Sequence, residues 1–182
     1  MIRVFGVGRG GGGPPSETPS ASGSSKIQPG QIRLQTELSE LELPPGCLID
    51  FPDAKDLMKF TVTIKPDEGF WRDAKFRFSF FIKPLYPHEP PKVKCETLVY
   101  HPNIDLDGNV CLNILREDWK PILSISAVIY GLLHLFLEPN PNDPLNQEAA
   151  QVLKENKPEF SRIVLRTLRG GSHQDRVFPR LI

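Results

Sequence analysis

The chain has 182 residues, enough for one folded domain with some additional segment. Hydrophobic residues make up 39% and charged residues 24%, a mixture typical of globular proteins. The 22 basic and 22 acidic residues give a formal net charge of zero, which argues against nucleic-acid binding as the main function.

The three cysteines are Cys47, Cys95 and Cys111. Because their number is odd and no CxxC pair occurs, they suit a reducing compartment better than a disulfide framework. No secretory signal is visible at the N-terminus, and the longest apolar stretch, around residues 129–137, is too short to span a bilayer. We therefore expect a cytoplasmic and nuclear protein that has neither a membrane nor a nucleic-acid partner.

Residues 6–29 are rich in Gly, Ser and Pro. Such a segment cannot bury enough apolar surface to offset its ordering entropy, so we predict a flexible N-terminal extension over 1–27 and a folded domain over 28–182. The extension begins with the apolar residues Met1, Ile2, Val4 and Phe5. These residues form either an inert tail or a docking motif, and composition alone favours the inert tail.

Apolar residues near helical spacing predict a first helix from Ile32 to about Leu43, which ends at Pro44-Pro45-Gly46. Four segments then have the composition or the period-two alternation of strands: 47–51, 58–64, 76–82 and 91–95. Because the turns between consecutive strands are short, we predict an antiparallel meander.

Three further helices are predicted after the strands. Ser124 is a candidate N-cap for a helix with a broad apolar face over 125–136, which we expect to be central and buried. A short helix follows at 147–154, and another starts at Pro158 and ends at Gly170-Gly171. The order helix, strands, helices indicates an α+β fold.

The region from Glu96 to Pro121 shows no periodicity, and a loop of this length in a compact domain is usually functional. It contains His101-Pro102-Asn103 and, eight residues after Asn103, Cys111. Further motifs flank the loop: Tyr86-Pro-His-Glu-Pro-Pro91 upstream, and Trp119-Lys-Pro121 and Pro139-Asn-Pro-Asn-Asp-Pro-Leu145 downstream. From about Gln31 to Gly170, the ordered spacing of these motifs closely resembles the ubiquitin-conjugating enzyme family.

This resemblance implies a four-stranded antiparallel sheet with an N-terminal helix, a central crossover helix and a C-terminal helical pair. Cys111 matches the residue that carries the modifier as a thioester. Asn103 matches an amide that supports the oxyanion or orders the loop that does, and Asp143 matches an acid near the incoming amine. No cofactor and no metal are implied, because ATP is used by the activating enzyme.

The resemblance also assigns the residues around the catalytic loop. The Tyr86–Pro87 peptide bond is expected to be cis, and His101 and Pro102 are expected to shape the loop. The side chains expected to contact the ligase are His88, Trp119, Pro121 and Ile122.

The run from Val93 to Pro121, together with the opening Met1-Ile-Arg-Val-Phe5, resembles one branch of the family, which conjugates the neddylation modifier. This branch implies that Met1, Ile2, Val4 and Phe5 dock on a heterodimeric activating enzyme. It also implies a RING ligase, a co-ligase and cullin lysines as partners. The linker differs from the branch, since it is Gly-rich where a Lys-rich tract is usual.

The chemical needs of thioester transfer agree with these residue assignments. Sulfur is a good leaving group, so aminolysis of a thioester needs an oxyanion donor and a positioned amine more than a general-base histidine. Three alternatives stay open at this point: an enzyme that conjugates ubiquitin itself, a non-catalytic binding module, and a hydrolase in which His101 activates Cys111. A metal site of Cys95, His101 and Cys111 lacks paired spacing and a fourth ligand.

Overall fold

The computed structural model describes residues 29–182. The predicted flexible extension and its docking motif (Met1, Ile2, Val4, Phe5) lie outside these residues. The main elements are, in chain order, α1 (Pro29–Ser39), β1 (Cys47–Asp50), β2 (Lys59–Ile64), β3 (Phe76–Phe81), β4 (Lys92–Cys95), a 3-10 turn η1 (Asn113–Leu115), α2 (Ile125–Leu137), α3 (Gln147–Glu155) and α4 (Lys157–Leu168).

The four strands form one antiparallel sheet in the order β1-β2-β3-β4, which confirms the predicted meander. The alternation in the sequence sets which face each side chain occupies. Val62 pairs with Phe78 and Ile64 with Phe76, and all four are completely buried. Their neighbours Thr63 and Arg77 point to the opposite face, as the period of two requires.

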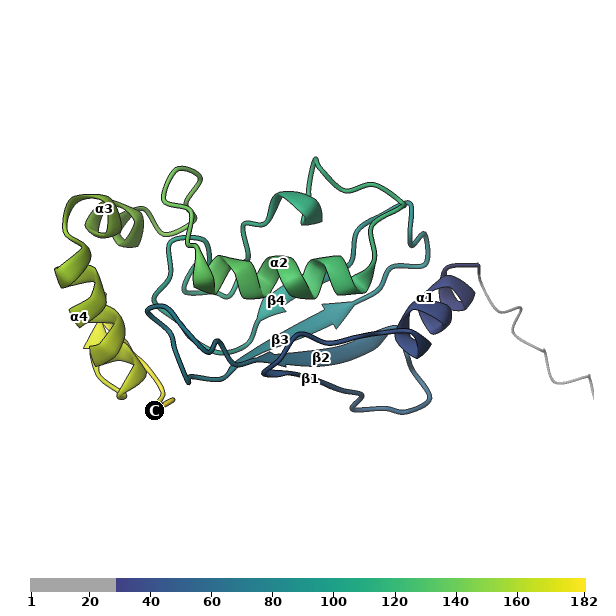
Figure 1. The fold of residues 1–182 in the computed structure, drawn as a ribbon, viewed down its shortest axis with the longest axis horizontal. Coiled ribbons are helices and arrows are strands. Elements are labelled where there is room, and N and C mark those ends of the chain that lie inside the picture. Colours follow the sequence, from purple (N-terminus) through teal and green to yellow (C-terminus); the bar gives the residue numbers. More distant parts are fainter. Residues whose placement is uncertain (1–28) are drawn as a thin grey trace, which may run out of the picture.

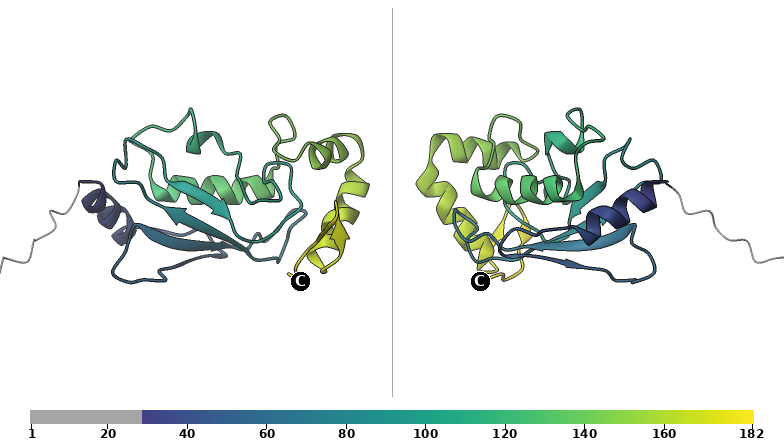
Figure 2. Two further views of the ribbon diagram at one scale, coloured as in Figure 1. Left: turned by 180° about the vertical axis from the view of Figure 1, so that it is seen from behind. Right: turned by 45° about the vertical axis from the view of Figure 1, so that its right-hand side comes forward.

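Helix α2 crosses one face of the sheet, while α1 lies at one end of the molecule and α3 and α4 at the other (Figures 1 and 2). The Ser124 hydroxyl accepts a hydrogen bond from the Ala127 N–H (3.3 Å), so the predicted N-cap is confirmed. The expectation of a buried helix is confirmed only in part, because α2 is not buried all round. Tyr130 is 52% exposed and His134 is also exposed, because the described chain covers this side of α2 incompletely.

Helix α1 begins three residues and ends about four residues earlier than predicted. The helical pattern continues through Leu41 and Leu43, but these two partly buried residues pack on the core from an irregular segment after the helix. Leu43 precedes Pro44, and a residue before proline disfavours the helical conformation. The leucines therefore keep their buried role after the helix has ended.

The structure adds a C-terminal hairpin that the sequence did not predict. Its strands β5 (Ser172–His173) and β6 (Arg176–Val177) have two residues each, and Gln174 and Asp175 turn the chain with positive φ. The usual Asn-Gly or Asp-Gly hairpin signal is absent from this turn. No helix among residues 29–182 has the length and apolar character needed to cross a bilayer.

Candidate active site

A tight contact with β4 positions the loop that carries Cys111. The Cys95 N–H donates to the Gly108 carbonyl at 2.8 Å, and bridges join Lys94 to Asn109 and Ile104 to Val110. Gly108 has φ +84°, and a side chain here would collide with the Cys95 carbonyl oxygen. The loop therefore rests directly on the edge of the sheet, three residues before Cys111.

Cys111 is 5% exposed, and its backbone N–H donates to the Asn103 carbonyl at 2.8 Å. Its thiol donates to Asp143 Oδ2 at 3.0 Å. Burial, followed by the hydrogen bond to Asp143, raises the pKa of the thiol to about 11, although the nearby Arg116 works in the opposite direction. The sulfur is consequently held in its thiol form at neutral pH.

The side chain of Asn103 ties two distant segments together. Its amide nitrogen donates to the carbonyls of Asn140 (2.7 Å) and Asp143 (3.2 Å), and its oxygen accepts from the Asn140 N–H (2.9 Å). Both amide hydrogens are thereby used, so none is free for an oxyanion. In this conformation the geometry supports the loop-ordering role of Asn103 over direct oxyanion donation.

The carbonyl of Pro102 strengthens the same junction. It accepts hydrogen bonds from the backbone N–H groups of Leu145 (2.9 Å) and Asn146 (3.0 Å). The His-Pro-Asn turn and the turn before α3 are thus fixed to each other, and this contact places the Asp143 carboxylate beside the Cys111 sulfur.

His101 is completely buried and stacks on Trp71, with ring centroids 4.3 Å apart. Its Nδ1 accepts from the Asn103 N–H (2.9 Å), which assigns the proton to Nε2, the nitrogen that contacts the Leu135 carbonyl (2.9 Å). Burial lowers its pKa to about 3. Because both ring nitrogens are occupied, His101 is unable to serve as the base of a Cys–His hydrolase, and its loop-shaping role agrees with the geometry.

A depression of about 470 Å³ opens beside the thiol. Its lining includes Leu112, Asn113 and Ile114 together with residues 138–141. Cys111, Asn103 and Asp143 all line this depression, so the structure brings together the three residues predicted to be catalytic.

The residues predicted to contact a ligase lie on two adjoining loops. The Trp119 ring N–H donates to the Pro87 carbonyl (2.8 Å), and the Tyr86–Pro87 bond is cis, as the resemblance implied. His88 and Pro121 are exposed, and Ile122 is 83% exposed. Leu85, directly before Tyr86, is also apolar and 61% exposed, and it was not among the residues predicted from the sequence.

The other two cysteines are buried free thiols whose pKa is raised by burial, to about 11 for Cys47 and about 12 for Cys95. Cys95 donates to the Thr97 carbonyl at 3.2 Å. Within residues 29–182, no group of three His, Cys, Asp or Glu side chains is arranged to hold a metal ion.

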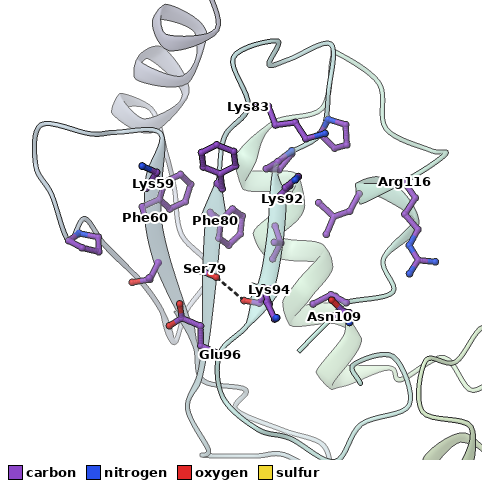
Figure 3. A pocket seen from close by; sticks show the side chains of 18 residues that line it. Lys59, Phe60, Ser79, Phe80, Lys83, Lys92, Lys94, Glu96, Asn109 and Arg116 are labelled. Atoms are coloured by element: carbon purple, nitrogen blue, oxygen red, sulfur yellow. Dashed lines mark hydrogen bonds between the residues drawn. The ribbon is translucent and has the colours of Figure 1, made fainter. Parts of the chain in front are cut away.

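A larger hollow, of about 660 Å³, lies against strands β2 to β4 (Figure 3). Lysines and an arginine line it, among them Lys92, Lys94 and Arg116, and Ser79 donates to the Lys94 carbonyl within it (3.4 Å). None of the predicted catalytic side chains lines this hollow. The candidate catalytic residues thus line the smaller of the two hollows, where the Cys111 thiol contacts Asp143.

Comparisons with known proteins agree with the geometry. The family described as "Ubiquitin-conjugating enzyme" matches residues 33–168. The chain is 59% identical over 150 residues to "Nedd8-conjugating enzyme UbcE2M" of Drosophila melanogaster, which covers 82% of this chain and 83% of the relative. It is 58% identical over 158 residues to "NEDD8-conjugating enzyme Ubc12" of Arabidopsis thaliana, with 86% of each chain covered.

Among solved structures, that of "S. cerevisiae Ubc12" superposes with a TM-score of 0.81 at 45% identity, covering 87% of this chain and 89% of that one. The likeness includes the sheet, the crossover helix and the helical pair predicted above. The chain belongs to the ubiquitin-conjugating enzyme family.

Proposed function

We propose that this chain conjugates NEDD8: it accepts the modifier from an activating enzyme as a thioester on Cys111 and transfers it to lysine. The observation that carries the proposal is the contact of the Cys111 thiol with Asp143 at 3.0 Å, beside a depression that can receive a peptide terminus. The names of relatives with 58% and 59% identity supply the identity of the modifier.

Charging is a thioester exchange. The Cys111 sulfur forms a bond with the carbonyl carbon at the modifier's C-terminus, the bond to the activating enzyme's sulfur breaks, and that thiol leaves with the proton. In the second step a lysine nitrogen attacks the same carbon, the bond to the Cys111 sulfur breaks, and the sulfur regains a proton. The net product is an amide bond and a free Cys111 thiol.

Asp143 serves the second step in this proposal. Once the sulfur is acylated it no longer donates to the carboxylate, so Asp143 is free to hold the incoming lysine ammonium beside the carbonyl and to accept its proton. Asn103 supports the step by ordering the turn that carries Asp143, since its amide hydrogens bond to residues of that turn.

A modification assay tests the central claim. Wild-type chain, NEDD8, its activating enzyme and ATP should give an adduct that thiol reductant removes, and Cys111→Ser should give none or a slower, reductant-resistant ester. Cys95→Ser is the matched control, since Cys95 is also buried but lies outside the depression. A normal reducible adduct on Cys111→Ser would refute the site. Charging with ubiquitin in preference to NEDD8 would favour the alternative enzyme.

The partners follow from the same proposal. We assign RING-ligase contact to the adjoining loops, which carry His88, Trp119, Pro121 and Ile122, and we assign cullin lysines as acceptors with a co-ligase at the N-terminus. Ile122 and its neighbours support a docking role because their exposure leaves them free to be buried by a partner. Cytoplasm and nucleus are the proposed locations.

The docking motif is tested by deletion of residues 1–5. Burial of one apolar side chain can contribute about 1.5–3 kcal/mol before ordering costs, so the deletion should lower the affinity of the activating enzyme for the chain. We expect a higher KM for charging with little change in kcat, and Phe5→Ala should reproduce part of the effect. Identical charging kinetics for all three forms would remove the motif from the proposal.

A further inference from the structure

Glu37 lies on α1, yet its carboxylate is directed into the protein and is only 10% exposed. One oxygen, Oε2, accepts a hydrogen bond from the Tyr86 hydroxyl (2.6 Å) and another from the Ile125 N–H (3.0 Å). The other oxygen receives the guanidinium of Arg33. A single side chain of α1 thus contacts two other parts of the chain, at Tyr86 and at Ile125.

Two of these contacts lie at the bases of the proposed ligase loops. Tyr86 is two residues before His88, and Ile125 is three residues after Ile122. The loops also touch each other through the Trp119–Pro87 hydrogen bond. The rings of Tyr86 and Trp119 also meet, with centroids 5.9 Å apart, and Glu37 adds a further connection that is made from α1.

The close fit of α1 supports a fixed spacing. Gly30, in the first turn of α1, lies so close to the loop that an added Cβ would come 2.6 Å from the Tyr86 carbonyl oxygen and 3.1 Å from that of Pro84. Tyr86 itself is 2% exposed. The helix and the loop consequently meet at both the glycine and the carboxylate, which leaves little freedom for the loop to shift.

A carboxylate suits this position for electrostatic reasons. The Ile125 N–H is one of the donors at the start of α2 that have no carbonyl partner within the helix, and the helix dipole favours negative charge there. Ser124 already caps the Ala127 N–H. Removing Glu37 would leave the Ile125 N–H and the buried Tyr86 hydroxyl without this acceptor, and the bases of both loops would lose their hydrogen bond to α1.

We propose that Glu37 is a positioning residue that sets the spacing of the two ligase-contacting loops and couples them to α1. The inference rests on the ligase surface assigned under Proposed function. It predicts a defect confined to ligase-dependent transfer, because Cys111, Asn103 and Asp143 make no hydrogen bond with Glu37 or Tyr86.

The test uses the full chain and four variants. Glu37→Ala removes all three contacts, and Tyr86→Phe removes only the loop contact. Glu37→Gln can keep both acceptances at one oxygen while it loses Arg33, and Arg33→Ala removes only that exposed ion pair. Each is assayed for charging, for discharge to free lysine without ligase, and for discharge against increasing concentrations of a RING ligase bound to a cullin. Thermal unfolding checks the fold.

For Glu37→Ala and Tyr86→Phe we expect the KM for the ligase to rise about tenfold, the size of one lost hydrogen bond to a charged group, with charging and ligase-free discharge within about twofold of wild type. Glu37→Gln and Arg33→Ala should stay near wild type. If Glu37→Ala does not fold, Tyr86→Phe alone decides. A folded Tyr86→Phe with an unchanged KM, or with equal losses in all three assays, overturns the inference.

Ile122→Ala distinguishes a failure of the positioning role of Glu37 from a failure of the ligase surface. If it raises the KM for the ligase while Tyr86→Phe does not, the ligase surface stands and the positioning role fails. If Ile122→Ala has no effect either, the ligase surface itself is wrong, and the inference falls with it.

Discussion

Replacing Asp143 with Asn should affect the two steps of the reaction in opposite directions. The Cys111 thiol is held protonated by burial and by the nearby carboxylate, which contacts it at 3.0 Å. Asn has the same shape but no charge, so the thiolate becomes easier to form. The transfer step should suffer, because the lysine ammonium loses the carboxylate that would hold it.

The magnitudes follow from the pKa. With a thiol pKa of about 11, only about one Cys111 in a thousand is thiolate at pH 8. Asp143 is exposed, so solvent screens it, and removing its charge should lower the thiol pKa by about one unit. Tenfold more thiolate, offset by its lower nucleophilicity, gives about threefold faster alkylation. Discharge to lysine should fall by about 10–100-fold.

Alkylation with iodoacetamide between pH 7 and 9, followed by mass spectrometry of the Cys111 peptide, measures the first effect. The Asp143→Asn profile should be displaced to lower pH. Arg116→Gln is the control of opposite sign, because Arg116 lowers the thiol pKa and its loss should slow alkylation. Single-turnover discharge of the charged enzyme measures the second effect.

Alkylation of folded Asp143→Asn at the wild-type rate or more slowly across this range would refute the proposed effect of the Asp143 charge on the thiol pKa. Faster alkylation combined with unchanged discharge would keep the electrostatic account of the thiol and remove Asp143 from the transfer step.

Two further predictions test the residues around the thiol. Asn103→Ala should lower the free energy of unfolding by about 2–4 kcal/mol, because three hydrogen bonds between the buried Asn103 amide and the turn at 140–143 are lost. It should also slow discharge more than charging. Denaturant unfolding and single-turnover assays check this, and no change in either would leave Asn103 without a role. Burial lowers the His101 pKa to about 3, so below about pH 6.5 the unfolded chain binds a proton at this histidine and the folded chain does not. The free energy of unfolding should therefore fall by about 1.4 kcal/mol per pH unit as the pH drops from 6.5 toward 3. His101→Gln should show a shallower decline in denaturant midpoints, and parallel profiles would contradict it.

The sheet was predictable from the sequence because its signal is local. Strict alternation from Met58 to Ile64 fixes both the strand and its buried face, and the structure confirms both. The placement of Cys111 with Asn103 and Asp143 was predictable for a different reason, since the spacing from Asn103 belongs to a recognisable motif, whereas the catalytic role of Cys111 stays a prediction. The hairpin at 172–177 was not, because its two-residue strands are too short to show a period.

Polar contacts between residues far apart in the chain were also not predictable from local sequence patterns. The partners of the Asn103 side chain lie 37 and 40 residues away, in a turn whose composition shows only that it is a turn. Glu37 was the most misleading position. With Arg33 four residues earlier it has the spacing of an ordinary surface ion pair on a helix, and nothing local indicates that its other oxygen accepts from Tyr86 and Ile125.

The contact between Gly108 and β4 has a consequence for how this sequence can vary. The exposed Asp107 beside it can change with little effect on packing, whereas any side chain at Gly108 meets the Cys95 carbonyl and strains the positive φ. Substitution there would lift the loop off the strand and carry the thiol away from its carboxylate. The position of the Cys111 sulfur thus depends on a residue that has no side chain, and we expect no other amino acid to be tolerated at position 108.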